Sequence, residues 1–326
     1  MNSELPPLVL TLGDRFGVGP ELVVRYLQSG KPIDRLMIVG DRRVFDDTCA
    51  RLAVDPEVHP VKSSGDVEPH KTGFLDMPFD AEIGPLGKVS VEAGRESLSI
   101  LDWLADALAA GSISGAVYAP LNKQAMRAAG HKNGDEFDYL ISKLGPEVAG
   151  GEINWLDGVW TSRVTSHIPV GEVATTITQQ KIEDAAELLA RVMADSGISD
   201  PRIVIAALNP HAGENGAFGT EEIDKIAPAV KSLQEKGIRA SGPIPADTVF
   251  PQSIHDKPVG IVTMYHDQGQ IALKLLGLGK SVTMLAGLGI PIATPGHGTA
   301  YDIAGKGIAR MDGMLSAIDF CTTLRT

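Results

Sequence analysis

The sequence predicts an α/β fold in which buried parallel strands alternate with helices on both faces of a sheet. Short apolar runs rich in Val and Ile recur along the 326 residues, and such runs are typical of strands buried on both faces. Stretches with helical spacing separate several of these runs. The later runs lead into polar loops that contain histidine, and ligands of open α/β sheets bind beyond the carboxyl ends of the strands. The length suits one large unit or two domains around a cleft.

The N-terminal region shows the alternation first. An apolar, partly β-branched run at residues 8–12 predicts a strand that ends at Gly13. Pro20 stands where the first turn of a helix tolerates proline, just before the helix predicted at 21–27. A second apolar run at 36–40 predicts the next strand, so strand, helix and strand follow in the order of a parallel unit.

The same alternation continues through the rest of the chain. Further helices are predicted at 91–110 and 124–129, and further strands at 115–119, 203–207 and 259–264. Residues 55–70 are rich in Pro, Lys and Glu, so we expect an exposed connection or a sheet edge there.

Composition excludes several classes of protein. The net charge is -12 and basic residues form no cluster longer than a pair, which argues against a nucleic-acid surface. No apolar run approaches the roughly 18 residues that a membrane span needs, and the N-terminus lacks a signal-peptide pattern. The two cysteines, Cys49 and Cys321, lie far apart in the sequence. A soluble protein of the reducing cytoplasm that acts on a small molecule is therefore expected.

Three loop histidines are the first candidates for chemistry. They are His167, His211 and His266, and two of them follow predicted strands. Neutral imidazole is a common metal ligand, and three imidazoles leave one coordination position open for a substrate oxygen. A loop histidine taken singly is more often a capping or hydrogen-bonding residue, and the sequence separations do not show that the three converge.

Carboxylates and lysines in similar loops extend this candidate site. Asp14, Asp247 and Asp267 each follow a predicted strand or turn, where a carboxylate can orient a metal-bound histidine or act as a general base. Helix capping is the alternative role for each of them. Lys123 and Lys274 can bind an anion or carry a proton, although most lysines only solvate a surface.

Two glycine-rich segments remain. In the segment 296–307, Gly298 allows a close approach of the backbone to a ligand, and Thr299 or Asp302 can bond to a ribose. A plain turn before a helix explains the same residues. The segment 13–20 does not fit the G-x-G-x-x-G fingerprint, so a standard Rossmann site is not predicted.

Taken together, these segments resemble the 4-hydroxythreonine-4-phosphate dehydrogenase (PdxA) family and its catabolic relatives. The last segment is also similar to the adenine-side loop of isopropylmalate and isocitrate dehydrogenases. The matching stretches are 13–21, 209–214, 242–248, 264–269 and 297–300.

The resemblance implies two α/β/α domains of the isocitrate/isopropylmalate dehydrogenase-like type, with the active site in the cleft between them. The first domain would comprise residues 1–125 and 265–326, with the chain termini and the cofactor loop. The second would comprise residues 126–264, with metal ligands and dimer contacts. The subunit is expected to form a homodimer with shared active sites, to which the partner contributes one metal ligand, taken to be His266.

The resemblance also implies the chemistry. A divalent metal, most simply Zn with Mg, Mn or Co as alternatives, would lower the pKa of a substrate hydroxyl. Hydride would pass to NAD, with NADP as an alternative, and the resulting β-keto acid would lose carbon dioxide. The implied roles are metal binding by His167, His211 and His266; catalysis by Asp247, Asp267 and Lys123; substrate binding by Lys274, Asp14 and Arg15; and cofactor binding by Gly298, Thr299 and Asp302.

The sequence departs from the family pattern where the substrate phosphate is expected to bind. Glu136 and Phe137 replace a His-Thr pair, and Thr283 and Ile292 replace Asn and Arg. Since a carboxylate repels a phosphate dianion, these substitutions favour a changed substrate. Arg15, in place of a usual proline, is a possible compensation.

Three alternatives for the function stay open. The first is a dehydrogenase of 4-hydroxythreonine 4-phosphate or a similar phosphorylated acid, in which Glu136 faces solvent and Arg15 or Lys274 holds the phosphate. The second acts on an unphosphorylated hydroxy acid or a carboxylated cis-dihydrodiol. The third is a catalytically silent metal-binding protein.

Overall fold

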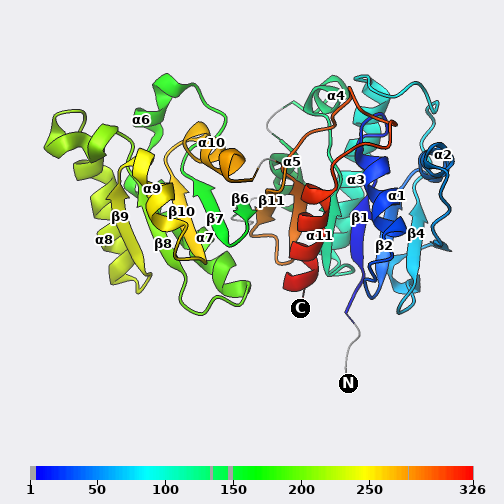
Figure 1. Ribbon diagram of the computed structural model, residues 1–326, viewed down its shortest axis with the longest axis horizontal. Helices are drawn as coiled ribbons and strands as arrows, with labels where there is room; N and C mark the ends of the chain where they lie inside the picture. The colour runs from blue at the N-terminus through cyan, green and yellow to red at the C-terminus, as the bar shows by residue number, and fades with distance from the viewer. Residues whose placement is uncertain (1–4, 133–134, 146–149, 278, 326) are drawn as a thin grey trace. The chain divides into compact units, whose positions relative to one another are not determined.

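The computed structural model describes residues 5–132, 135–145, 150–277 and 279–325, which form two compact units (Figure 1). Unit 1 comprises Met1–Ala149 and Leu288–Thr326, and unit 2 comprises Gly150–Gly287. Both units combine strands with helices, which confirms the predicted α/β fold.

Unit 1 contains a parallel sheet with the strand order β3-β4-β2-β1-β5-β12. Its strands are β1 (Leu8–Thr11), β2 (Leu36–Gly40), β3 (His59–Val61), β4 (Thr72–Asp76), β5 (Gly115–Tyr118) and β12 (Ile292–Pro295). Its helices are α1 (Gly19–Gln28), α2 (Arg42–Leu52), α3 (Val91–Ala109), α4 (Lys123–Ala128), α5 (Glu136–Leu144) and α11 (Asp312–Leu324), with a short 3-10 turn at Ser64–Asp66. The central strands β1, β2 and β5 are buried along their whole length, as their continuous apolar runs predict.

Unit 2 contains a mixed sheet with the strand order β11-β6-β7-β10-β8-β9. Its strands are β6 (Gly151–Leu156), β7 (Val159–Arg163), β8 (Arg202–Ala206), β9 (Ala240–Ile244), β10 (Val259–Thr263) and β11 (Val282–Ala286). Its helices are α6 (Val173–Thr176), α7 (Gln179–Asp195), α8 (Ala227–Glu235), α9 (Ala246–Ser253) and α10 (His266–Gly277), with 3-10 segments at Val170–Glu172 and Pro210–Gly216 and a π-helical turn at Glu222–Ile226. The core beneath α9 and α10 is made of apolar side chains such as Val204, Phe250 and Ile261.

The strands β6 and β7 form an antiparallel hairpin that the sequence analysis did not predict. Asp157 and Gly158 connect them, with φ angles of 47° and 78°. A two-residue turn with both φ angles positive matches the right-handed twist of the flanking strands, and Asp-Gly suits it well. β11 then pairs with β6 in the antiparallel sense, so only β7, β10, β8 and β9 run parallel in this unit.

The unit boundaries differ from the predicted domain limits at 125 and 265. Helix α5 packs against α3 of unit 1. Tyr139 of α5 donates a hydrogen bond to Asp102 of α3 over 2.9 Å. At the other boundary, β11 forms a ladder with β6, in which Thr283 lies opposite Asn154. Packing therefore assigns α5 to unit 1, and α10 and β11 to unit 2.

The remaining expectations concern the edges and the surface. β3 is the edge strand of the sheet in unit 1 and lies within the predicted exposed segment 55–70. Cys49 and Cys321 are both buried and free. Among the helices that the structure describes, none is long and apolar enough to cross a membrane.

Candidate active site

The three histidine loops follow neighbouring parallel strands of unit 2. His167 lies beyond β7, His266 begins α10 beyond β10, and His211 lies beyond β8. Because β10 lies between β7 and β8 in the sheet, the three loops leave it at the same edge. Neighbouring strands are about 4.8 Å apart, so this topology brings together residues that are far apart in the sequence.

Hydrogen bonds connect the three loops directly. The backbone N–H and the hydroxyl of Thr165 both donate to the carbonyl of Met264, over 3.1 and 2.8 Å. The side chain of Gln268 accepts from the N–H of Met264 over 2.7 Å and donates to the carbonyl of Ala207 over 2.8 Å. Gln268 thus holds the start of α10 against the end of β8.

His167 and His266 lie side by side in the same chain. Their ring centroids are 5.7 Å apart and their planes are tilted by 41°. The Nδ1 atom of His266 lies 2.7 Å from a carboxylate oxygen of Asp267. A carboxylate at Nδ1 leaves Nε2 available to a metal. The adjacent strands β7 and β10 thus place the ring of His266 beside His167, and the contribution of His266 to a partner's site stays a prediction.

His211 lies in a strained loop. Residues 211–215 all have positive φ angles, between 45° and 79°. Non-glycine residues rarely adopt this conformation, and such strain clusters at functional sites. The buried carboxylate of Glu222 secures the start of the loop, because it accepts from the backbone N–H groups of Leu208 and Asn209 over 2.9 and 2.7 Å.

The donors fit a divalent metal only in part. Two adjacent imidazoles with a supporting carboxylate are suitable chemistry for zinc or a related ion. Within residues 5–132, 135–145, 150–277 and 279–325, however, no group of three or more His, Cys, Asp or Glu side chains is arranged to hold a metal. The structure brings together His167 and His266 but does not complete the predicted triad.

The other predicted residues of unit 2 lie on neighbouring elements. Asp247 is exposed in the first turn of α9, and it lines a groove together with Asp267 of α10. Lys274 is exposed in the last turn of α10. Thr283 is half-buried in β11, and its hydroxyl accepts a hydrogen bond from Asn154 over 2.9 Å.

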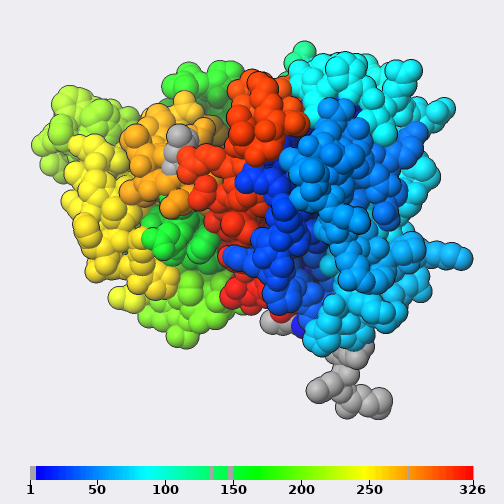
Figure 2. Space-filling view, turned by 45° about the vertical axis from the view of Figure 1, so that its right-hand side comes forward, coloured from blue at the N-terminus to red at the C-terminus, as the bar shows by residue number. Residues whose placement is uncertain are grey.

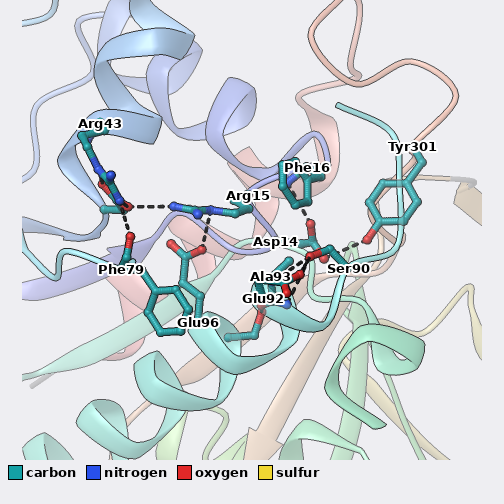
Figure 3. Close-up of polar contacts among 12 residues, drawn as sticks. Asp14, Arg15, Phe16, Arg43, Phe79, Ser90, Glu92, Ala93, Glu96 and Tyr301 are labelled. Atoms are coloured by element: carbon teal, nitrogen blue, oxygen red, sulfur yellow. Dashed lines mark hydrogen bonds and ion pairs between the residues drawn. The ribbon is translucent and has the colours of Figure 1, made fainter. Parts of the chain in front are cut away.

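In unit 1, the loop after β1 is held by the buried carboxylate of Asp14. This carboxylate accepts from the N–H of Phe16 over 2.9 Å and from the hydroxyl of Tyr301 over 2.8 Å (Figure 3). Burial raises the pKa of Asp14 despite these bonds. Burial and the nearby Asp14 charge raise the pKa of Tyr301. The first loop is thereby joined to the predicted cofactor loop, in which Tyr301 lies.

The backbone joins these two loops again. The N–H of Val18 donates to the carbonyl of Thr299 over 3.0 Å. A Cβ atom on Gly17 would lie 2.9 Å from the Cβ of Thr299, so this close approach requires glycine. In the space-filling view, the orange-red segment after β12 lies against the dark blue N-terminal residues (Figure 2). Gly298 and Asp302 are exposed and accessible to a ligand, whereas Thr299 is buried and contributes mainly to the loop contact.

Arg15 lies in a buried ion cluster. Its guanidinium contacts Asp41 and Glu96 at 2.7 Å each, and its side chain is only 1% exposed (Figure 3). The Nε contact with Glu96 is close but not aligned as a hydrogen bond. Arg43 also contacts Asp41, at 2.7 Å. Two carboxylates thus neutralise the charge of Arg15 inside the unit, and its substrate-binding role stays a prediction.

This cluster contains two carboxylates with opposite pKa shifts. Burial opposes the ionisation of Asp41, but hydrogen bonds and the charge of Arg43 lower its pKa overall. Burial raises the pKa of Glu96 to about 7, and the nearby Asp41 and Asp14 reinforce the rise, whereas Arg15 opposes it.

Glu96 predicts a pH dependence of stability. Its folded-state pKa of about 7 lies above its ordinary value of 4.5, so the folded protein holds its proton more tightly than the unfolded chain. This stabilisation is complete below 4.5 and is lost as the pH rises through about 7. Relative to the parent, the variant Glu96→Gln should therefore gain stability as the pH rises through this window. Denaturant unfolding across the window measures the gain, and a pH-independent difference between the two proteins would contradict the assignment.

Glu136 lies at the first position of α5 and is only 8% exposed. Its carboxylate lies 3.7 Å from the ammonium group of Lys123, which also lies 3.8 Å from Asp135. Asp135 caps the helix through the N–H groups of Phe137 and Asp138. The alternative in which Glu136 faces solvent is wrong, and two carboxylates partly offset the charge of Lys123. Phe137 is half-buried beside them.

Ile292 does not lie at a ligand-accessible surface. It begins β12, pairs with Ala116 of β5, and its side chain is 0% exposed. Ile292 therefore packs in the sheet of unit 1, and its direct contact with substrate stays a prediction. Ile292 is buried because a branched alkyl side chain is more stable in the apolar interior than at a polar surface.

Several residues that support the site were not predicted from the sequence. Gln268 lies within the predicted motif 264–269 but was not assigned a role there. Glu222, Asn154 and Arg163 are isolated polar residues whose partners are distant in the sequence, and no sequence pattern indicates such pairs.

Comparisons with known proteins agree over most of the chain. The sequence profile of the family described as pyridoxal phosphate biosynthetic protein PdxA matches residues 32–321. A Pseudomonas aeruginosa protein provisionally named 4-hydroxythreonine-4-phosphate dehydrogenase 2 is 39% identical, over 95% of this chain and 94% of its own. D-threonate 4-phosphate dehydrogenase of Bordetella bronchiseptica is 34% identical, over 97% and 92%. The crystal structure of 4-hydroxythreonine-4-phosphate dehydrogenase from Klebsiella pneumoniae matches with a TM-score of 0.85 and 31% identity, over 100% of both chains.

Proposed function

Because the chain belongs to the family of the pyridoxal phosphate biosynthetic protein PdxA, we propose that it is an NAD-linked dehydrogenase that depends on a divalent metal. Its substrate is a small hydroxy acid whose secondary alcohol is oxidised, with loss of the β-carboxyl group as carbon dioxide. The observation that carries this proposal is the pairing of His167 with His266 beyond adjacent parallel strands, with Asp267 beside His266. NADP in place of NAD, and Zn, Mg, Mn or Co as the ion, are all compatible with these residues.

The residues of unit 2 would hold the ion and manage protons. His167, His266 and His211 are the proposed ligands, and a bound divalent ion would supply Lewis-acid polarisation of the substrate oxygen. Asp267 orients the ring of His266. Asp247 lies on the neighbouring α9 and is the proposed general base for the hydroxyl proton.

The residues of unit 1 would bind the dinucleotide and the distal part of the substrate. Gly298 and Asp302 present an exposed backbone and carboxylate to a ribose, while the contacts of Asp14 with Tyr301 keep this loop in place. Lys123 is the proposed proton carrier on this side. The hydride of the alcohol carbon would pass to NAD⁺, and the hydroxyl proton would pass to Asp247.

The substrate is the point at which this chain departs from its relatives. A buried carboxylate at Glu136 repels a phosphate dianion, and neither Arg15 nor Ile292 offsets this repulsion. Glu136 with Phe137 suits a hydroxyl or an ammonium group on an apolar frame. An unphosphorylated hydroxy acid or a carboxylated cis-dihydrodiol is therefore the second candidate substrate, beside phosphorylated acids of the kind named for the relatives.

Exchanging these two residues tests the substrate proposal. The parent should turn over 4-hydroxythreonine 4-phosphate with kcat/KM below about 10⁴ M⁻¹s⁻¹, the lower end for competent enzymes. The double variant Glu136→His, Phe137→Thr should raise this value, because it removes a negative charge and adds two hydrogen-bond donors. Glu136→Gln is the matched control, which removes the charge alone and should give a smaller gain. Efficient turnover of the phosphorylated substrate by the parent would contradict this account of the pocket.

A second copy of the chain is the proposed partner. Helices α9 and α10 border a groove of about 660 Å³ whose lining is mainly apolar and includes Ile271 and Leu275. Ile271, Leu275 and Leu276 of α10 are 59%, 83% and 44% exposed, and an exposed apolar patch marks an interaction surface. Asp247 and Asp267 line the same groove, so a copy docked there would lie beside the proposed catalytic residues. Sedimentation at assay concentration tests this, and an active monomer would contradict it.

One assay separates the candidate functions. NADH formation is measured with phosphorylated hydroxy acids, unphosphorylated hydroxy acids and diols, each with and without added metal. Metal-dependent turnover of any of these classes supports the dehydrogenase and identifies its substrate class. Metal binding without turnover of any of them would favour the catalytically silent alternative.

A further inference from the structure

A network of polar side chains runs beneath the histidine loops of unit 2. Its centre is Arg163, the last residue of β7, whose side chain is 8% exposed. The guanidinium forms an ion pair with Glu152 and donates to the side-chain oxygen of Asn154 over 2.9 Å. Its Nε–H donates to the hydroxyl of Ser166 over 2.5 Å. One cation therefore links β6, β7 and the loop that carries His167.

Asn154 extends the network in two directions. It lies directly opposite Thr283 in the β6–β11 ladder and donates to its hydroxyl over 2.9 Å. Its side-chain oxygen also accepts from Gln270 over 2.6 Å. Gln270 lies one turn after His266 on α10, on the same helix face. The network thus reaches the predicted substrate residue and the helix that begins with a proposed metal ligand.

The direction of these bonds affects the chemistry at Thr283. A hydroxyl has one proton and two lone pairs. Because Asn154 donates to the oxygen of Thr283, that hydroxyl keeps its own proton for an acceptor on a ligand. Ser166, which immediately precedes His167, accepts a hydrogen bond from Arg163. Its hydroxyl therefore also keeps its own proton for another acceptor.

From this arrangement we propose that Arg163 is a positioning residue that orders the metal and substrate sides of the site together. It fixes the His167 loop through Ser166, and it fixes Thr283 and the α10 helix through Asn154 and Gln270. Its charge is balanced by Glu152, so it acts through its hydrogen bonds and not as a receptor for an anionic substrate. This inference rests on the proposed function for the identity of the ligands that are positioned.

The test compares variants that separate folding from positioning. Arg163→Met removes the network but leaves Glu152 without its cation, so the double variant Arg163→Met, Glu152→Gln also removes that unpaired charge. Arg163→Lys is the conservative variant. Arg202→Met is the matched control, since Arg202 belongs to a strand of the same unit but pairs at the surface with Asp256. Three quantities are measured: zinc affinity by competition with a chelator, amide exchange of residues 164–169 without metal, and KM separately from kcat.

The single and double Met variants should bind zinc about 10–100-fold more weakly, as expected when a group that supports a metal ligand is lost. Their loop amides should exchange faster and KM should rise, with partial recovery in Arg163→Lys and no change in Arg202→Met. A double variant with parental zinc affinity and loop exchange would overturn the inference. If the parent binds none of Zn, Mg, Mn or Co, the proposed function fails, and loop exchange alone then decides the positioning role.

Discussion

Replacing His266 with alanine is expected to remove most of the bound metal and to lower NADH formation by more than about 100-fold. Loss of a residue that only supports a metal ligand costs up to about 100-fold, so loss of a ligand itself should cost more. The reason is geometric. His266 lies beside His167 and is oriented by Asp267, so its loss leaves one imidazole of the observed pair. Metal content by elemental analysis and NADH absorbance measure the two effects.

The control for this variant is His59→Ala. His59 is a partly exposed histidine of the edge strand β3 in unit 1, and its Nε2 lies 3.3 Å from Glu57. Its replacement should change neither metal content nor turnover. His211→Ala then tests whether the strained loop after β8 supplies the third ligand. If metal and turnover survive in both His266→Ala and His211→Ala, the proposed ligand set is wrong.

Replacing Arg15 with methionine is expected to lower the free energy of unfolding by about 3–5 kcal/mol, the usual cost of removing one partner from a buried ion pair. The loss should be largest above pH 7, because Glu96, whose pKa is about 7, is then ionised in the parent. Below that pH, Glu96 can take up a proton and part of the cost disappears. Denaturant unfolding at two pH values measures both effects.

Two further variants make this prediction specific. Arg51→Met removes an exposed pair with Asp47 on α2 and should cost less than about 1 kcal/mol. The double variant Arg15→Met, Glu96→Met replaces both buried charges with apolar groups and should recover much of the loss. An Arg15→Met variant that is as stable as Arg51→Met would show that the cluster does not hold the first loop, and would favour the substrate role of Arg15.

The sequence predicted the buried strands of both units because their signal is local. Runs such as 8–12 and 259–264 are apolar throughout, and each corresponds to a strand whose bounds differ by about one residue. The β6–β7 hairpin was missed although Asp157-Gly158 is a strong turn signal. Its flanking strands contain polar residues such as Glu152, Asn154 and Arg163, which hide the apolar pattern.

The residue types of the site could be predicted from the sequence, but their positions relative to one another could not. The loops of His167 and His266 were identified, but only the strand order shows that β7 and β10 are neighbours. The burial of Arg15 and Ile292 was not predicted, because burial and ion pairing depend on the fold around a residue. The sequence shows that Arg15 carries a charge, but not that Asp41 and Glu96 neutralise it.

The most direct test of the central claim is the metal dependence of NADH formation. The protein is stripped of metal with a chelator, assayed with NAD⁺ and the best substrate of the hydroxy acid and diol screen, and assayed again after a divalent ion is restored. The proposed function predicts that turnover is lost on stripping and recovers on reloading in the parent, but not in His266→Ala. Undiminished NADH formation by the stripped parent would contradict a metal-centred dehydrogenase at these histidines.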